Sequence, residues 1–102
     1  MGSLTGKKDI DRMKKWEAIF ERELIRRTNG LYKYQCQARK VMFGCFIMVF
    51  TREDKLQATK NFKKCSIRTG AAGLAANKGS CAIRFELNDS SFMFVNLHAT
   101  SG

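Results

Sequence analysis

The residues best suited to chemistry lie in the C-terminal third of the sequence. Lys78 and Asn77 close a run of small residues over positions 69–79, and His98 ends an apolar segment. A glycine-rich backbone lets amide groups approach an anion closely, Lys78 adds a positive charge, and Asn77 can donate hydrogen bonds from its amide. This run therefore predicts a phosphate-binding loop, with a tight connection between two strands as the alternative.

His98 is the only histidine in the sequence. It lies where an apolar strand opens into small polar residues, which is where sheet-based enzymes place reacting groups. A purely structural histidine is the alternative. Asp89, Ser90 and Ser91 lie at the far end of the same hairpin, so they do not form a Ser-His-Asp triad with His98.

Several other site types are excluded by spacing. A Walker A loop needs Ser or Thr after its lysine, whereas Gly79 follows Lys78, and Gly70 and Gly73 do not fit a dinucleotide-binding fingerprint. The carboxylates show no spacing typical of a metal site. The four cysteines form no C-x-x-C pair, so we expect four reduced, mostly buried thiols in a protein inside the cell.

The elements that must position these residues begin with a helix over residues 9–27. Apolar side chains recur there every three or four residues, Asp9 can cap the start, and Asn29-Gly30 supplies a left-handed stop. Apolar and polar residues alternate from Tyr32 to Ala38, which predicts a half-buried strand. The apolar run from Val41 to Phe50 predicts one strand covered on both faces.

The rest of the chain predicts further strands. A polar turn at residues 51–54 can open a short helix over 55–58, and a strand is expected over 62–68. Apolar and polar residues alternate after residue 79, turn-forming residues follow at 88–90, and an apolar segment follows at 92–97. Together they predict an antiparallel hairpin over 80–97. The pattern is one helix followed by strands, an α+β fold in a single domain over residues 1–102.

Composition limits the class of protein. The chain has 102 residues and a formal net charge of +10, and its longest apolar run, ten residues, is half of what crosses a bilayer. Residues 1–68 hold seventeen basic and seven acidic side chains, whereas the remainder is neutral. Such a basic half favours an acidic membrane surface or a nucleic acid, with a merely solvated face as the alternative.

Two segments carry a resemblance to a known family. Residues 67–85, Ile-Arg-Thr-Gly-Ala-Ala-Gly-Leu-Ala-Ala-Asn-Lys-Gly-Ser-Cys-Ala-Ile-Arg-Phe, and residues 91–102, which contain Phe-Val-Asn-Leu-His, resemble two signatures of the inositol polyphosphate 5-phosphatases. The resemblance is strong from residue 67 onward and weak over 10–66. It implies part of a four-layer α/β sandwich of the type shared with DNase I and apurinic endonucleases.

The resemblance also implies an activity and its residues. It implies magnesium-dependent removal of the 5-phosphate from phosphoinositides or inositol polyphosphates. His98 would hydrogen-bond the scissile phosphate, Asn77 and Lys78 would line the substrate pocket, and Arg68 would stand at a basic position of the family. The family's motifs for the metal, the base and the nucleophile are missing from these 102 residues, so the Mg²⁺ ligands are expected outside this chain.

Three functions follow as alternatives. The first is the middle of a 5-phosphatase domain, inactive by itself, cytoplasmic or peripheral at anionic membranes, with no nucleic acid as partner. The second is a nuclease-type phosphodiesterase of the same superfamily, which the positive charge favours. The third is a non-catalytic module that binds anionic lipid or RNA through the basic half.

Overall fold

The computed structural model describes residues 6–42, 45–68 and 78–98. The elements are, in chain order, helix α1 (Lys7–Arg27), strands β1 (Tyr34–Met42) and β2 (Cys45–Arg52), the 3-10 helix η1 (Glu53–Ala58), and strands β3 (Thr59–Arg68), β4 (Gly79–Leu87) and β5 (Ser90–His98).

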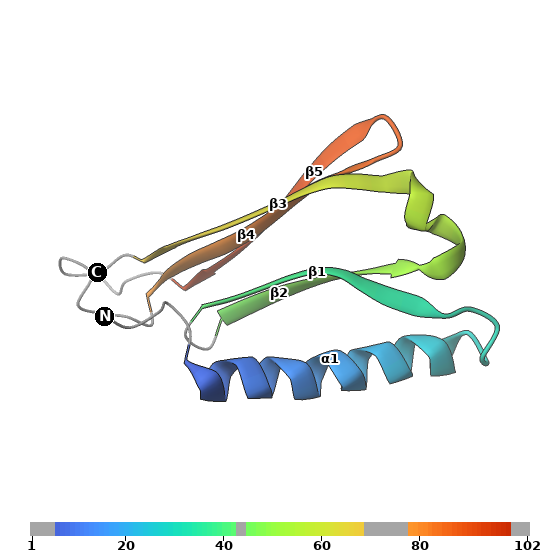
Figure 1. Cartoon of the computed structure of the whole chain (residues 1–102), viewed down its shortest axis with the longest axis horizontal. Coiled ribbons are helices and arrows are strands. Elements are labelled where there is room, and N and C mark those ends of the chain that lie inside the picture. Colours follow the sequence, from blue (N-terminus) through green and yellow to red (C-terminus); the bar gives the residue numbers. More distant parts are fainter. Residues whose placement is uncertain (1–5, 43–44, 69–77, 99–102) are drawn as a thin grey trace.

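These elements stack in three layers, seen edge-on in Figure 1. Helix α1 covers a two-stranded antiparallel sheet, β1-β2, and that sheet packs on a three-stranded antiparallel sheet of order β3-β4-β5. The expected α+β architecture, one helix followed by antiparallel strands, is confirmed. Within the described ranges no helix covers the outer face of the β3-β4-β5 sheet, so three of the four expected layers are formed.

Helix α1 begins two residues earlier than its sequence predicts. Gly6, not Asp9, is the N-cap residue, and it offers no side-chain cap. Asp9 lies in the first turn instead, where a carboxylate interacts favourably with the helix dipole. The predicted stop is confirmed: Asn29 and Gly30 have φ of 54° and 75°, and the Gly30 N–H donates to the Ile25 carbonyl at 3.0 Å.

The prediction of one strand from Val41 to Phe50 is wrong. Strand β1 ends at Met42 and β2 begins at Cys45, and the two pair antiparallel from Met42–Cys45 to Tyr34–Arg52. The last two residues of β1, Val41 and Met42, and most of β2 are apolar because the sheet is covered on each face, by α1 on one and by the second sheet on the other. Gly44 is the one interruption of this apolar run, and a single glycine inside a strand pattern does not by itself mark a chain reversal.

The core lies between the two sheets. Ala38 of β1 and Ile83 and Phe85 of β4 are buried, and they are surrounded by Ile47, Val49, Phe62 and Leu87. Phe85 also stacks on Phe62 and Phe92 at ring distances of 5.2 and 5.9 Å. Burial of these side chains is the main force that holds the sheets face to face.

The second sheet confirms the predicted hairpin. Strands β4 and β5 pair without interruption from Leu87–Ser90 to Gly79–His98. Strand β3 starts at Thr59 rather than at residue 62, and its pairing with β4 is shifted by a bulge between Lys60 and Lys63. Asn61 sits in that bulge with φ of 56° and donates to Glu86 at 2.7 Å.

An ion pair links helix α1 to β1. Glu17 accepts from Nε and Nη2 of Arg39 at 2.6 and 3.0 Å. Glu17→Gln is expected to lower the free energy of unfolding by about 0.5–1 kcal/mol, because a two-pronged, partly exposed pair between separate elements is lost. Urea titration measures this. Glu23→Gln is the control: Glu23 pairs with Arg26 and Arg27, which both lie within α1 and are exposed, so its effect should be smaller, and an equal effect would contradict the prediction.

Candidate phosphate-binding site

Three of the predicted site residues meet at one end of the β3-β4-β5 sheet. The register places Arg68 of β3 opposite Gly79 of β4, and Gly79 opposite His98 of β5. Lys78 directly precedes Gly79. Residues opposite each other on antiparallel strands share a face, so Arg68 and His98 flank Gly79 on the same face of the sheet. The strand ends thus gather three nitrogen-bearing side chains that are 10 to 30 residues apart in the sequence.

Lys78 and His98 are in direct contact. The Lys78 Nζ lies 3.0 Å from His98 Nε2. Both atoms are nitrogens that can bind an acceptor oxygen, and the contact brings them to the same place beside the sheet. The pair is exposed to solvent. It therefore presents an ammonium and an imidazole to one point, which suits a phosphate oxygen.

Gly79 is required where these strands meet. Its φ is +147°, a conformation that residues with a side chain rarely adopt. A Cβ at this position would lie 2.1 Å from the Ile67 carbonyl oxygen and 2.9 Å from Met42 Cε. The glycine thus lets β3 and β4 approach just where Arg68 and Lys78 are held.

Asn96 supports the same end of the sheet, and the sequence analysis did not identify it. Its Nδ2 donates to the Phe46 carbonyl of β2 at 2.9 Å, which ties β5 to the other sheet two residues before His98. The sequence feature that could have identified it is that Asn96 is the one amide side chain in an otherwise apolar stretch, residues 92–97. We assign Asn96 a positioning role, since it touches the backbone that carries His98 rather than Lys78 or His98 themselves.

Two cysteines lie beside Asn96. Cys45 and Cys81 are buried with their Sγ atoms 3.6 Å apart, and Cys45 Sγ also lies 3.6 Å from the Asn96 carbonyl oxygen. All four cysteines are unbridged, as expected. The expectation that they are mostly buried holds for this pair, whereas Cys36 is half-buried and Cys65 is exposed.

The buried pair predicts an alkaline loss of stability. Burial, with the contact to Cys45, raises the pKa of Cys81 from 9.0 to about 12. Above pH 9 the unfolded chain loses a proton that the folded chain keeps, so stability should fall as pH rises from about 9 towards 12. Thermal unfolding followed across this range measures the effect. Cys81→Ala should flatten the dependence, whereas Cys65→Ser should not; equal slopes in all three proteins would refute the assignment.

Asn77 lies outside the described residues, so its place relative to His98 remains a prediction. Among the residues that the structure describes, no three His, Cys, Asp or Glu side chains come together as metal ligands. The donors near His98 are cationic or neutral, and such a set does not fit Mg²⁺, which prefers oxygen ligands. No described helix is long and apolar enough to cross a membrane.

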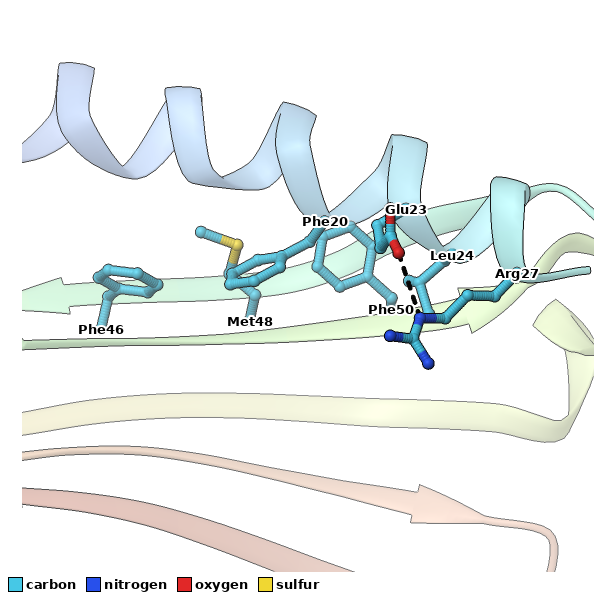
Figure 2. Close-up of a pocket in the computed structure, with 7 residues that line it drawn as sticks. All are labelled: Phe20, Glu23, Leu24, Arg27, Phe46, Met48 and Phe50. Carbon is cyan, nitrogen blue, oxygen red and sulfur yellow. Dashed lines mark hydrogen bonds and ion pairs between the residues drawn. The ribbon is translucent and has the colours of Figure 1, made fainter.

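A separate apolar hollow of about 340 Å³ lies between α1 and β2 (Figure 2). Phe46, Met48 and Phe50 point into it from β2, and Phe20 and Leu24 from α1; Glu23 and Arg27 pair at its rim. It lies on the helix side of the β1-β2 sheet, whereas Lys78 and His98 belong to the other sheet. With an apolar lining it does not suit a phosphate.

Comparison with known proteins gives concordant matches. A family model described as "Endonuclease/Exonuclease/phosphatase family 2" matches residues 3–102. The chain is 30% identical over 95 residues to inositol-1,4,5-trisphosphate 5-phosphatase 1 of Schizosaccharomyces pombe, covering 92% of this chain and 9% of that protein. It is 38% identical over 69 residues to type I inositol polyphosphate 5-phosphatase 8 of Arabidopsis thaliana, covering 68% and 14%.

A solved structure has the same fold. It is the inositol polyphosphate 5-phosphatase domain of SPsynaptojanin in complex with inositol (1,4)-bisphosphate and calcium ion. The TM-score is 0.77 at 29% identity, and the match covers 88% of this chain and 26% of that one. This chain therefore spans about a quarter of the solved domain and a small part of the curated relatives.

Proposed function

The chain belongs to the inositol polyphosphate 5-phosphatases of the endonuclease/exonuclease/phosphatase family, and we propose that it forms part of a domain that removes the 5-phosphate from phosphoinositides or inositol polyphosphates. The observation that carries this proposal is the 3.0 Å contact between Lys78 and His98, with Arg68 at the same strand end. A phosphate monoester is the ligand whose charge and oxygen geometry suit such a group.

The three side chains would act by electrostatics. A transferring phosphoryl group concentrates negative charge on its oxygens, and donors already in place stabilise that charge without reorganisation. The Lys78 ammonium would turn from Nε2 of His98 to a phosphate oxygen. In the tautomer that carries its proton on Nε2, His98 would then donate to a second oxygen of the same group.

The proposed phosphatase reaction needs a metal ion. The related solved domain is in complex with a calcium ion. We propose that Mg²⁺ serves the reaction, supplying positive charge at the phosphate, and that its oxygen ligands come from outside the described residues. We therefore expect the 102-residue chain to bind the phosphate group of a substrate without hydrolysing it, because His98 and Lys78 cannot hold the metal.

We also propose that the protein acts at anionic membrane surfaces. The net charge of +10 would draw the protein to anionic membrane surfaces, where phosphoinositides reside, from the cytoplasmic side. Liposome sedimentation at two salt concentrations tests this. Charge-driven binding should weaken at high salt, whereas absent or salt-insensitive binding would contradict it.

The function is tested on the chain and on a chimera. The isolated chain should bind inositol 1,4,5-trisphosphate with a shift of the His98 ring signals in NMR spectra, and Lys78→Ala should abolish that shift. For turnover, the chain replaces the matching quarter of the SPsynaptojanin domain, and phosphate release from the same substrate is measured with Mg²⁺. Nicking of plasmid DNA without phosphate release would instead support the nuclease alternative.

A further inference from the structure

We propose that Cys45 and Cys81 form an oxidisable pair, which hydrogen peroxide converts into a disulfide bond between the two sheets of the fold. The inference concerns two thiols that the candidate phosphate site does not use, and it does not depend on the phosphatase function. Cys45 begins β2 and Cys81 lies in β4, so a bond between them would join the β1-β2 sheet covalently to the β3-β4-β5 sheet.

The two thiols already face each other. Their Sγ atoms lie 3.6 Å apart, in van der Waals contact, although the residues are 36 positions apart in the sequence. A disulfide bond is about 2.0 Å long, so the two sulfur atoms must approach by roughly 1.6 Å. Each Sγ moves with a single side-chain torsion, χ1, and rotation at the two residues can supply a movement of this size. The fold therefore places this pair ready to form a bond.

The other two cysteines do not compete for either partner. Cys65 lies opposite Ala82 in the register, and Ala82 follows Cys81 on β4. Consecutive residues of a strand point to opposite faces, so Cys65 and Cys81 lie on different faces of their sheet. Cys36 has its Sγ 3.5 Å from a carbonyl oxygen of its own strand, β1. All four cysteines belong to the described residues, and Cys45–Cys81 is the one pair among them whose Sγ atoms are in contact.

The exposure of the two thiols assigns the order of the steps. Cys45 is 7% exposed and Cys81 only 1%, so a small neutral oxidant reaches Cys45 first. Burial also raises the pKa of Cys81 to about 12, which disfavours its reactive thiolate form. Cys45 is therefore the thiol that meets the peroxide, and Cys81 is the one that closes the bond.

The reaction balances with one peroxide per disulfide. The Cys45 sulfur attacks a peroxide oxygen, the O–O bond breaks, and the products are a sulfenic acid and one water. The Cys81 sulfur then attacks the sulfenic sulfur, the S–O bond breaks, and the Cys81 proton leaves with the hydroxide as a second water. The two thiols lose two electrons and two protons, and the peroxide is reduced to water.

The bond would lie beside the end of β5 that carries His98. Cys81 is opposite Asn96 in the β4-β5 register, and Cys45 Sγ lies 3.6 Å from the Asn96 carbonyl oxygen. The Asn96 side chain donates to the carbonyl of Phe46, the residue after Cys45. A disulfide at this point would replace a contact between the sheets by a covalent bond, and would fix their spacing two residues from His98.

The test is a peptide map of the 102-residue chain after exposure to hydrogen peroxide. Trypsin cuts after lysine and arginine, so Cys45 lies in the peptide of residues 41–52 and Cys81 in that of residues 79–84, each with a single cysteine. The expected product is these two peptides joined, lighter than their sum by two hydrogen atoms and separated by dithiothreitol. Retained thiols, further oxidation of Cys45 without a cross-link, or joining to Cys36 or Cys65 instead would overturn the proposal.

Variants and a denatured control separate a bond directed by the fold from random pairing. Cys36→Ser combined with Cys65→Ser should keep the cross-link, whereas Cys45→Ala should abolish it, with Cys81→Ala in its place if that variant unfolds. In the folded chain the Cys45–Cys81 bond should exceed any other cysteine pairing at least about tenfold, and this preference should be lost in concentrated urea. The same preference in urea would show that the fold does not direct the bond.

Stability gives a second measurement. The oxidised chain should unfold at a higher urea concentration than the reduced chain, because the bond restricts the unfolded state. An unchanged or lower midpoint would show that the sheets do not accommodate the bond, and would refute the proposal. Circular dichroism checks that the chain is folded before oxidation, and otherwise the same measurements are made on the chimeric phosphatase domain.

Discussion

His98→Ala in the chimeric phosphatase domain is expected to lower the rate of phosphate release about a thousandfold. The imidazole is aligned by three contacts: Lys78 at Nε2, the pairing with Gly79, and the Asn96 bond two residues earlier. Removing one preorganised donor to a developing oxyanion costs about 10²–10³ in kcat, and loss of the partner of Lys78 adds to this. Release of inorganic phosphate under saturating substrate measures the effect.

Two further variants separate a role in catalysis from a role in folding. Ser91→Ala changes the exposed far end of the same strand, so it should leave the rate unchanged. His98→Gln keeps a hydrogen-bond donor at about the same reach, and we expect it to restore part of the rate. If His98→Ala retains more than half of the activity, the proposed phosphate site is wrong.

Gly79→Ala is expected to lower the free energy of unfolding of the chain by about 3–5 kcal/mol. The new Cβ would stand 2.1 Å from a backbone oxygen that cannot move without separating β3 from β4. The positive φ adds strain to this overlap. Urea-induced unfolding, followed by circular dichroism, gives the change in the free energy of unfolding.

Gly30→Ala is the control for the backbone strain alone. Gly30 also has a positive φ, +75°, but a Cβ there would meet nothing within 4 Å. Its substitution should cost about 1 kcal/mol, the ordinary price of a left-handed residue with a side chain. Equal losses at the two glycines would show that the crowding between β3 and β4 does not govern stability.

The signals that predicted the elements correctly are local ones. Helix α1 follows from a repeat of three to four residues and from the Asn29-Gly30 stop, and the β4-β5 hairpin follows from alternation on either side of a turn. The chain reversal between β1 and β2 was missed, because the sequence is apolar on both sides of Gly44 and a lone glycine there is also compatible with one continuous strand. An apolar run reads the same whether it continues or folds back.

For the candidate site, too, part follows from local sequence and part from tertiary contacts. From the sequence alone, Asn77 and Lys78 in the small-residue run and His98 at a strand end are candidates for binding phosphate, whereas Arg68 enters only through the family resemblance; these roles stay predictions. Only the tertiary structure decided that Arg68, Lys78 and His98 lie at the same end of one sheet, that Asn96 ties β5 to β2, and that Gly79 has no room for a side chain. The physical reason is that local preferences act over a few residues, whereas strand register and sheet packing depend on contacts between residues up to fifty positions apart.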